Sequence, residues 1–313
     1  MELTLALAQK IGSLSIIIAL GFLAVRLKIM KAGDSKPLSQ FALYFLTPCA
    51  RLDAFQYEFT MAKLAGMGVS LLASLIVVVV FAALSAILRR ALPLTVVDYT
   101  SLEYPNAGNF MLPLIASAMG GEWVIYLSAC FLVMNVFMFT HGQAVLSDTG
   151  RVTPAMIFKN PVMLSIFAGL AVFVSGWHIP GIAGECVASL GNMMGPVYMF
   201  TIGMILGGAN LKRVFLNRKA WLICFGRLVL YPVAAMLVLC VCGIFRIHPQ
   251  AREIITIAAL TAGAPSAVMV VQFTQMFRTD EEAQFASAVN ILSTVLCLLT
   301  MPGIAWLYQT LAF

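Results

Sequence analysis

The sequence predicts an all-α polytopic membrane protein. Of its 313 residues, 61% are hydrophobic and only 10% are charged, and the mean hydropathy is +0.97. Apolar runs recur along the whole chain, and the connections between them are too short for a soluble domain. A soluble domain of this length would need far more polar surface to cover its core. The net charge of +6 is therefore attributed to membrane-flanking loops rather than to nucleic-acid binding.

Ten stretches are long and apolar enough to cross a bilayer, which takes about 20 residues of helix. Two of them are weak hydropathy peaks: 37–56 carries Arg51 and Asp53 near its end, and 94–118 carries glycines and prolines. The expected spans are 5–26, 37–56, 64–89, 94–118, 122–146, 160–177, 185–209, 219–244, 251–275 and 285–310.

The basic residues support this number of spans. When loops are assigned alternately to the two sides, 13 of the 19 lysines and arginines fall on one side. Loops rich in Lys and Arg stay in the cytoplasm, so both termini are expected outside. Removing either weak span would move every later loop to the opposite side and destroy this bias.

Ten spans suggest two halves of five, which would have opposite orientations because five is odd. The expected halves are 1–146 and 160–313, joined by a short cytoplasmic linker at 147–159. The fourth span contains NAGNFMLPLIA and the ninth contains TAGAPSAVMVVQ, so each has an Ala-Gly pair followed by a proline, Pro113 or Pro265. Gly/Pro-interrupted segments at matching positions of two halves indicate a binding site at the middle of the membrane.

A proline inside a helix removes an N–H and opens the backbone. Within a membrane, such a break survives only where protein or water covers it. Two breaks beside each other would present half-helix N-termini, whose free N–H groups and positive dipole ends suit a carboxylate. The predicted binding residues are Asn106, Asn109, Pro113, Pro265 and Ser266; the alternative is that the prolines only bend their helices.

Ionisable residues inside spans are functional candidates. Glu103 is predicted to carry a coupling proton, or else to face a cytoplasmic vestibule or pair with a cation. Arg227 could extend to the interface, or act as a charge partner or an attractor of anions. Further candidates for a coupling-ion site, which could equally be ordinary interhelical hydrogen-bonding groups, are Asn135, Gln272, Asn290, Ser293 and Thr294.

The segments PNAGNFMLPL and GAPSAVMVVQF, in a chain with ten expected spans, resemble the auxin efflux carrier family. That family comprises plant auxin carriers and bacterial relatives described as permeases of malonate or other organic acids. Pro105, Asn106 and Pro113 match the motif of the fourth helix, and Pro265 matches that of the ninth. The resemblance adds Asn192 as the counterpart of an asparagine in the seventh helix.

The resemblance implies a fold similar to that of bile-acid transporters, with scaffold helices 1, 2, 6 and 7 and a mobile domain of helices 3–5 and 8–10 that carries crossed, broken helices 4 and 9. It implies a secondary transporter of small organic anions, coupled to a proton, to sodium or to neither, with no other cofactor, and a homodimer through the scaffold. The short linker resembles that of bacterial members, which predicts a bacterial inner membrane location. The residues after Pro265 depart from the pattern of the plant carriers, which argues against auxin as the substrate.

Two other functions are kept open: an anion channel or facilitator, and a membrane sensor on a transporter-like fold. An enzyme is not expected, because the sequence has no nucleophile elbow, no phosphate-binding loop and no metal-ligand spacing.

Overall fold

The computed structural model describes residues 2–56, 60–147 and 161–312, and these residues form helices without a β-strand. Some spans consist of one helix, whereas others are built from consecutive shorter segments that include 3-10 and π turns. The segments are α1 (Glu2–Arg26), η1 (Ala32–Asp34), α2 (Ser35–Phe41), η2 (Ala42–Leu46), α3 (Thr47–Ala54), α4 (Met61–Ala91), α5 (Val96–Glu103), η3 (Ala107–Met111), α6 (Leu112–Ala118), η4 (Gly121–Trp123), α7 (Val124–Phe137), η5 (Met138–Gly142), α8 (Gln143–Leu146), α10 (Pro161–Ser175), α11 (Gly181–Gly208), α12 (Leu211–Leu216), α13 (Arg218–Phe225), η6 (Gly226–Leu230), α14 (Tyr231–Val241), η7 (Ile244–Arg246), α15 (Ala251–Ala262), α16 (Val268–Phe277) and α17 (Asp280–Ala312).

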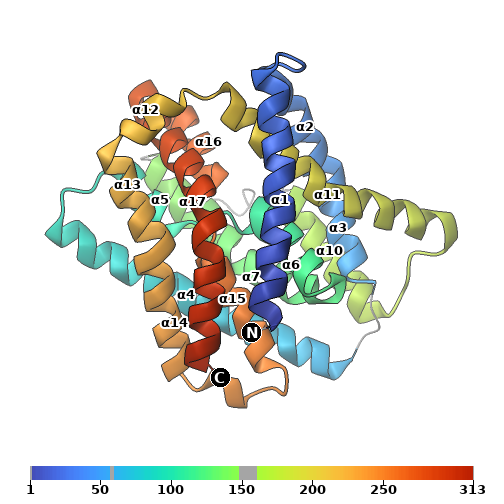
Figure 1. Cartoon of the computed structure of the whole chain (residues 1–313). Coiled ribbons are helices and arrows are strands. Elements are labelled where there is room, and N and C mark those ends of the chain that lie inside the picture. Colours follow the sequence, from blue (N-terminus) through green and yellow to red (C-terminus); the bar gives the residue numbers. More distant parts are fainter. Residues whose placement is uncertain (1, 57–59, 148–160, 313) are drawn as a thin grey trace.

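The chain is an all-α membrane protein. Within the described ranges, five continuous helical stretches are long and apolar enough to cross a membrane: Met61–Ala91, Gly121–Leu146, Gly181–Gly208, Arg218–Val241 and Asp280–Leu311. Helices α1 and α17 lie side by side, and the two chain ends lie at the same end of the molecule (Figure 1). The expected linker at 147–159 falls almost entirely outside the described residues.

Helices α1, α3, α10 and α11 pack against one another. The contact between α1 and α11 is close because small residues face each other. A Cβ added to Gly21 would collide with the backbone oxygen of Phe200, and a Cβ added to Gly203 would collide with that of Ile18. Small residues are what allow membrane helices to approach this closely, so these helices form a tightly joined group, which we call the α1–α11 group.

A second set of contacts joins α4, α7, α14, α15 and α17. Its centre is packed by buried aromatic residues: Phe81 of α4 contacts Tyr231 of α14 edge to face, with 5.2 Å between ring centroids. The Tyr231 hydroxyl is 2.7 Å from Ser85 Oγ, so the polar tip of this buried ring is satisfied. We call this set the α4–α17 group, and it includes α15, the first half of one of the two interrupted helices described next.

The two interrupted helices meet at their breaks, and we call this meeting point the crossing. Helix α5 ends at Glu103 and the chain resumes helical turns at Ala107, whereas α15 ends at Ala262 and α16 begins at Val268. The two extended links pair as a short antiparallel bridge. Asn106 N donates to Pro265 O at 2.7 Å, and Ala267 N donates to Tyr104 O at 2.9 Å. Each break therefore satisfies backbone groups of the other, as burial requires.

The prolines act differently from one another. The interruption of the fourth span lies at Pro105 and not at Pro113, which directly follows the π turn η3 as the second residue of α6. The residue before a proline is pushed into extended backbone, and Tyr104 has φ −101° and ψ 111°. Pro196 lies inside an uninterrupted α11, and Pro48 follows the π turn η2, so neither ends its helix.

Candidate functional site

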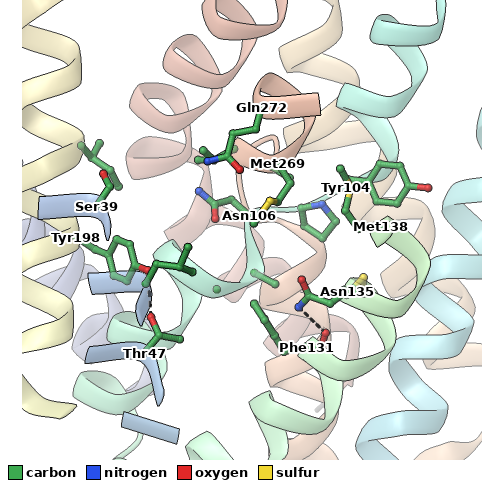
Figure 2. A pocket seen from close by; sticks show the side chains of 18 of the residues that line it. Ser39, Thr47, Tyr104, Asn106, Phe131, Asn135, Met138, Tyr198, Met269 and Gln272 are labelled. Atoms are coloured by element: carbon green, nitrogen blue, oxygen red, sulfur yellow. Dashed lines mark hydrogen bonds between the residues drawn. The ribbon is translucent and has the colours of Figure 1, made fainter. Parts of the chain in front are cut away.

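A cavity of about 420 Å³ lies where the α1–α11 group meets the crossing. Its walls come from α2, η2 and α3 on one side, α11 on another, and α7 with η5 on a third. The two extended links and the first turn of α16 complete it. Figure 2 shows Asn106 near the middle of this cavity, between Gln272 and the side chains of Thr47 and Phe131.

The cavity is mostly apolar with a few polar groups, which is typical of a site for a small molecule. Of the predicted residues, Asn106, Asn135 and Gln272 line it. The Asn135 amide donates to Phe131 O at 2.9 Å, so part of its capacity is used locally. The Asn106 side chain makes no capping hydrogen bond to the η3 segment that follows it, and it lies in the cavity wall, where its amide can meet a ligand.

Two helical segments begin at the cavity. The first is the η3–α6 segment, which starts after Asn106, and the second is α16, which starts after Ala267. The first N–H groups of a helix lack partners within the helix, and the dipole makes that end positive. Because both starts lie in the cavity wall, the cavity can accept a negatively charged group.

The opposite ends of the broken helices meet Arg227, which is completely buried. Its guanidinium donates from Nη1 to Leu102 O at 2.9 Å, from Nε to Ala264 O at 3.0 Å and from Nη2 to Ala262 O at 2.8 Å. Leu102 is next to the end of α5, Ala262 is the last residue of α15, and Ala264 follows in the link. The arginine therefore does not extend to the interface, and it joins both negative helix ends to one fixed charge.

Glu103 is buried at the end of α5 and faces η5. Its Oε2 lies 3.7 Å from His141 Nδ1 and accepts no hydrogen bond from a described residue. The same His141 nitrogen is 2.6 Å from the hydroxyl of Tyr104, and Tyr104 lines the cavity. Three groups able to hold or pass a proton thus connect the crossing to the cavity wall.

The remaining predicted residues lie elsewhere. Ser266 lies in the link, and the side chains of Ser293 and Asn290 hold its backbone: Ser266 N donates to Ser293 Oγ at 3.1 Å, and Asn290 Nδ2 donates to Ser266 O at 2.6 Å. Thr294 bonds back to Asn290 O. Asn192 is exposed on α11 and is not among the cavity residues. The side chains of Asn109 and Pro113 lie outside the description.

Several residues of the cavity wall were not predicted from the sequence. Thr47 Oγ1 lies 3.1 Å from the Tyr198 hydroxyl, and both residues line the cavity (Figure 2). Lys36 of α2 lines it as well and is exposed. The available signal was their position beside prolines inside spans: Thr47 directly precedes Pro48, and Tyr198 is two residues after Pro196.

In the described part of the chain, no group of three or more His, Cys, Asp or Glu side chains is arranged to hold a metal ion. Comparison with known proteins gives two findings. A family model described as "Membrane transport protein" matches residues 7–154 and 145–305. A relative from Rhizobium meliloti (strain 1021), named "Putative malonate transporter", is 26% identical over 218 residues. That match covers 66% of this chain and 65% of the relative, so just under two thirds of the relative's length is matched.

The family model covers nearly the whole chain, in two consecutive matches. The chain belongs to the membrane transport protein family, which is the auxin efflux carrier family that its fourth- and ninth-span motifs resemble.

Proposed function

We propose that this protein is a secondary transporter that carries a small carboxylate across the membrane by alternating access, and that malonate or a similar dicarboxylate is the substrate. The observation that carries the proposal is the cavity at the crossing, where Asn106 and the starts of two helical segments face the same space. The name of the matched relative supports the choice of malonate.

The proposed binding mode uses positive helix ends and one amide. A carboxylate at the crossing would accept hydrogen bonds from the first N–H groups of the η3–α6 segment and of α16. The Asn106 amide would donate a further hydrogen bond. Lys36, at the wall formed by α2, would raise the local concentration of anions. The apolar residues around these groups exclude water, which strengthens each electrostatic contact.

The proposed movement uses the two packing groups. We assign the α1–α11 group, with α2, to the static scaffold, and the α4–α17 group with the crossing to the mobile domain. The proposal includes ten spans in two inverted repeats, with both termini outside. Since the cavity includes the basic start of α2, it would open to the cytoplasm in this structure. A homodimer would form through the scaffold.

Coupling is assigned to a proton through Glu103. Its unpartnered oxygen, its separation from His141 and the link from His141 to Tyr104 favour a group that exchanges a proton as the crossing moves. Sodium is the second candidate for a coupling ion. Transporters with broken helices bind Na⁺ at the carbonyl groups of half-helix ends. Here three such carbonyls accept hydrogen bonds from Arg227 instead, which disfavours sodium.

The test is counterflow in proteoliposomes loaded with unlabelled malonate, measured with labelled malonate outside. A carrier with an occluded state accumulates label transiently, whereas a channel or facilitator does not, and a sensor binds without flux. The variant Asn106→Ala loses a hydrogen bond to a charged ligand, worth about 1.5–3 kcal/mol, so apparent affinity should fall by about 10-fold to 100-fold.

Asn192→Ala is the matched control, because this asparagine is exposed on α11 and lies outside the cavity. It should transport like the parent protein, and both variants should unfold at the parent's temperature. Equal kinetics for Asn106→Ala and the parent would remove Asn106 from the site. Absence of malonate counterflow in the parent protein would refute the choice of substrate.

A further inference from the structure

A second buried arginine stands beside the cavity without a counter-charge. Arg51 lies on α3, one turn after Thr47, and is 1% exposed. Its guanidinium carbon sits 4.1 Å from the centroid of the Phe131 ring, and Nη1 donates to Ser128 Oγ at 3.4 Å. Ser128 and Phe131 are on α7, so Arg51 bridges the α1–α11 group and the α4–α17 group.

Nothing in the described residues neutralises this charge. The two ion pairs found there join other residues, Glu103 with His141 and Lys219 with Asp98. The nitrogens Nε and Nη2 of Arg51 are buried without an acceptor. Burying an unpaired charge is costly, and stacking on one phenyl ring recovers only a small part of that cost. An arrangement of this kind persists where function requires it.

The two unpartnered nitrogens have a specific geometry. In a guanidinium, the Nε–H bond and one Nη2–H bond point the same way and form a fork that matches the two oxygens of a carboxylate. The third nitrogen, Nη1, is the one that Ser128 occupies. The Nε and Nη2 groups of Arg51 therefore form a complete bidentate site for a carboxylate, and both nitrogens are buried in this structure.

Neighbouring side chains separate this fork from the cavity. Phe131 touches both, because its ring lines the cavity and also carries the guanidinium. Thr47 and Tyr198 line the cavity next to it and are joined by their hydroxyls; Figure 2 shows these two with Phe131 below Asn106. Acidic side chains on the described elements packed around α3 are the exposed Glu122 of η4 and Glu185 of α11, and Asp53 lies on α3 itself.

We propose that Arg51 is the anion-binding residue of the opposite-facing state, in which it receives a carboxylate group of the dicarboxylate substrate. This proposal rests on the proposed transport function. When the α4–α17 group moves along α3, Ser128 and Phe131 leave Arg51, and the fork becomes accessible from the side opposite to the cavity mouth. Arg51 then holds the substrate until the crossing takes it over.

The experiment compares entry from the two sides. Right-side-out and inside-out membrane vesicles are prepared from the parent, Arg51→Gln and Arg51→Lys, and the KM for malonate is measured in each. Arg51→Gln should raise KM at least tenfold for entry from the side opposite to the cavity mouth, and less than twofold from the other side. Arg51→Lys keeps the charge but loses the fork, so its KM should be intermediate on that first side only.

A purely structural role for Arg51 gives a different result. It would lower the amount of folded protein or the maximal rate by the same factor in both vesicle types, with KM unchanged, and this outcome overturns the proposal. Parent vesicles without malonate uptake would instead refute the proposed function, so the two failures are distinguishable.

A second measurement uses no arginine variant. Ser128→Cys is introduced after the exposed Cys186 and Cys242 are replaced by serine, and a membrane-impermeant maleimide is added on the side opposite to the cavity mouth. Ser128 is fully buried here, so labelling should be slow without substrate and several-fold faster during malonate exchange. A labelling rate that malonate does not change contradicts the proposed opening.

Discussion

Replacing Arg227 by methionine tests whether one side chain holds the crossing together. Methionine fills a similar volume but donates no hydrogen bond. The substitution leaves the carbonyl oxygens of Leu102, Ala262 and Ala264 without the donors that now lie 2.8–3.0 Å away. These carbonyls belong to ends of two broken helices in a dry interior, where no water can replace the lost donors.

The expected magnitude follows from three charge-assisted hydrogen bonds. Each contributes about 1.5–3 kcal/mol, and removal of the buried guanidinium returns part of this because its own desolvation cost disappears. A net loss of about 4 kcal/mol is therefore expected. At about 2–4 °C per kcal/mol for proteins somewhat smaller than this one, the unfolding temperature should fall by about 10 °C.

The assay is thermal unfolding of the detergent-purified protein, followed by intrinsic fluorescence or by loss of monodisperse protein. Arg246→Met is the matched control, because Arg246 is exposed in η7 and its loss should move the unfolding temperature by less than about 2 °C. An unfolding temperature for Arg227→Met equal to or above that of the parent would refute the reasoning, since it would mean that the three carbonyls do not need the guanidinium.

Three further predictions concern coupling, packing and attraction of the anion. Glu103→Gln should flatten the pH dependence of malonate transport, because the variant cannot exchange a proton beside His141; a pH profile identical to the parent's would exclude this group from coupling. Gly21→Ala should lower the unfolding temperature by several degrees, because the added Cβ meets the backbone of α11 and such overpacking costs about 1–3 kcal/mol. Gly12→Ala is the control, since Gly12 has open space around it and its substitution should be neutral. Equal effects of the two substitutions would contradict the close packing. Lys36→Gln should raise the KM for malonate about threefold at low ionic strength and less at high salt, and a salt-independent change would show that Lys36 does not act through its charge.

The helices could be predicted from the sequence because bilayer thickness makes hydropathy a strong signal. The predicted span 64–89 lies within Met61–Ala91, and the predicted span 185–209 is close to Gly181–Gly208. The crossing was also predictable in outline, because glycine and proline occur at matching places in the fourth and ninth spans. Its position was not: Pro113 follows a helical turn and fits the start of α6, while Pro105 forces Tyr104 into extended backbone.

The cavity could be predicted only in part. Asn106, Asn135 and Gln272 were identified because amides in a membrane span are unusual, and all three line the cavity. Asn290 and Ser293 were also chosen as polar residues inside a span, but their side chains bind the backbone of the link at Ser266. Local sequence cannot separate these cases, because whether an amide faces a ligand or a neighbouring carbonyl depends on the rotation of its helix against partners far away in the chain.

The burial of the two arginines could not be predicted from local sequence either. Sequence placed Arg51 at the end of a weak span and left Arg227 open between the interface and the interior, whereas both are buried. Arg227 is satisfied by three carbonyls that come from two helices remote in sequence. No single-helix pattern contains this information, since the partners exist only once the two breaks have come together.

The electrostatic asymmetry of the crossing bears on which ions the cavity can accept. A broken helix exposes one negative end and one positive end, so a symmetric crossing would favour neither sign of charge. Here the negative ends of α5 and α15 are bound to a fixed guanidinium, while the positive starts of the η3–α6 segment and of α16 line the cavity. The uncompensated dipole ends at the cavity are therefore positive, and Lys36 is the charged side chain that lines it. A cation placed there would meet repulsion from both helix starts, and an anion would meet attraction from both. Malonate should therefore compete with other small dianions for uptake, whereas organic cations of the same size should leave malonate uptake unchanged.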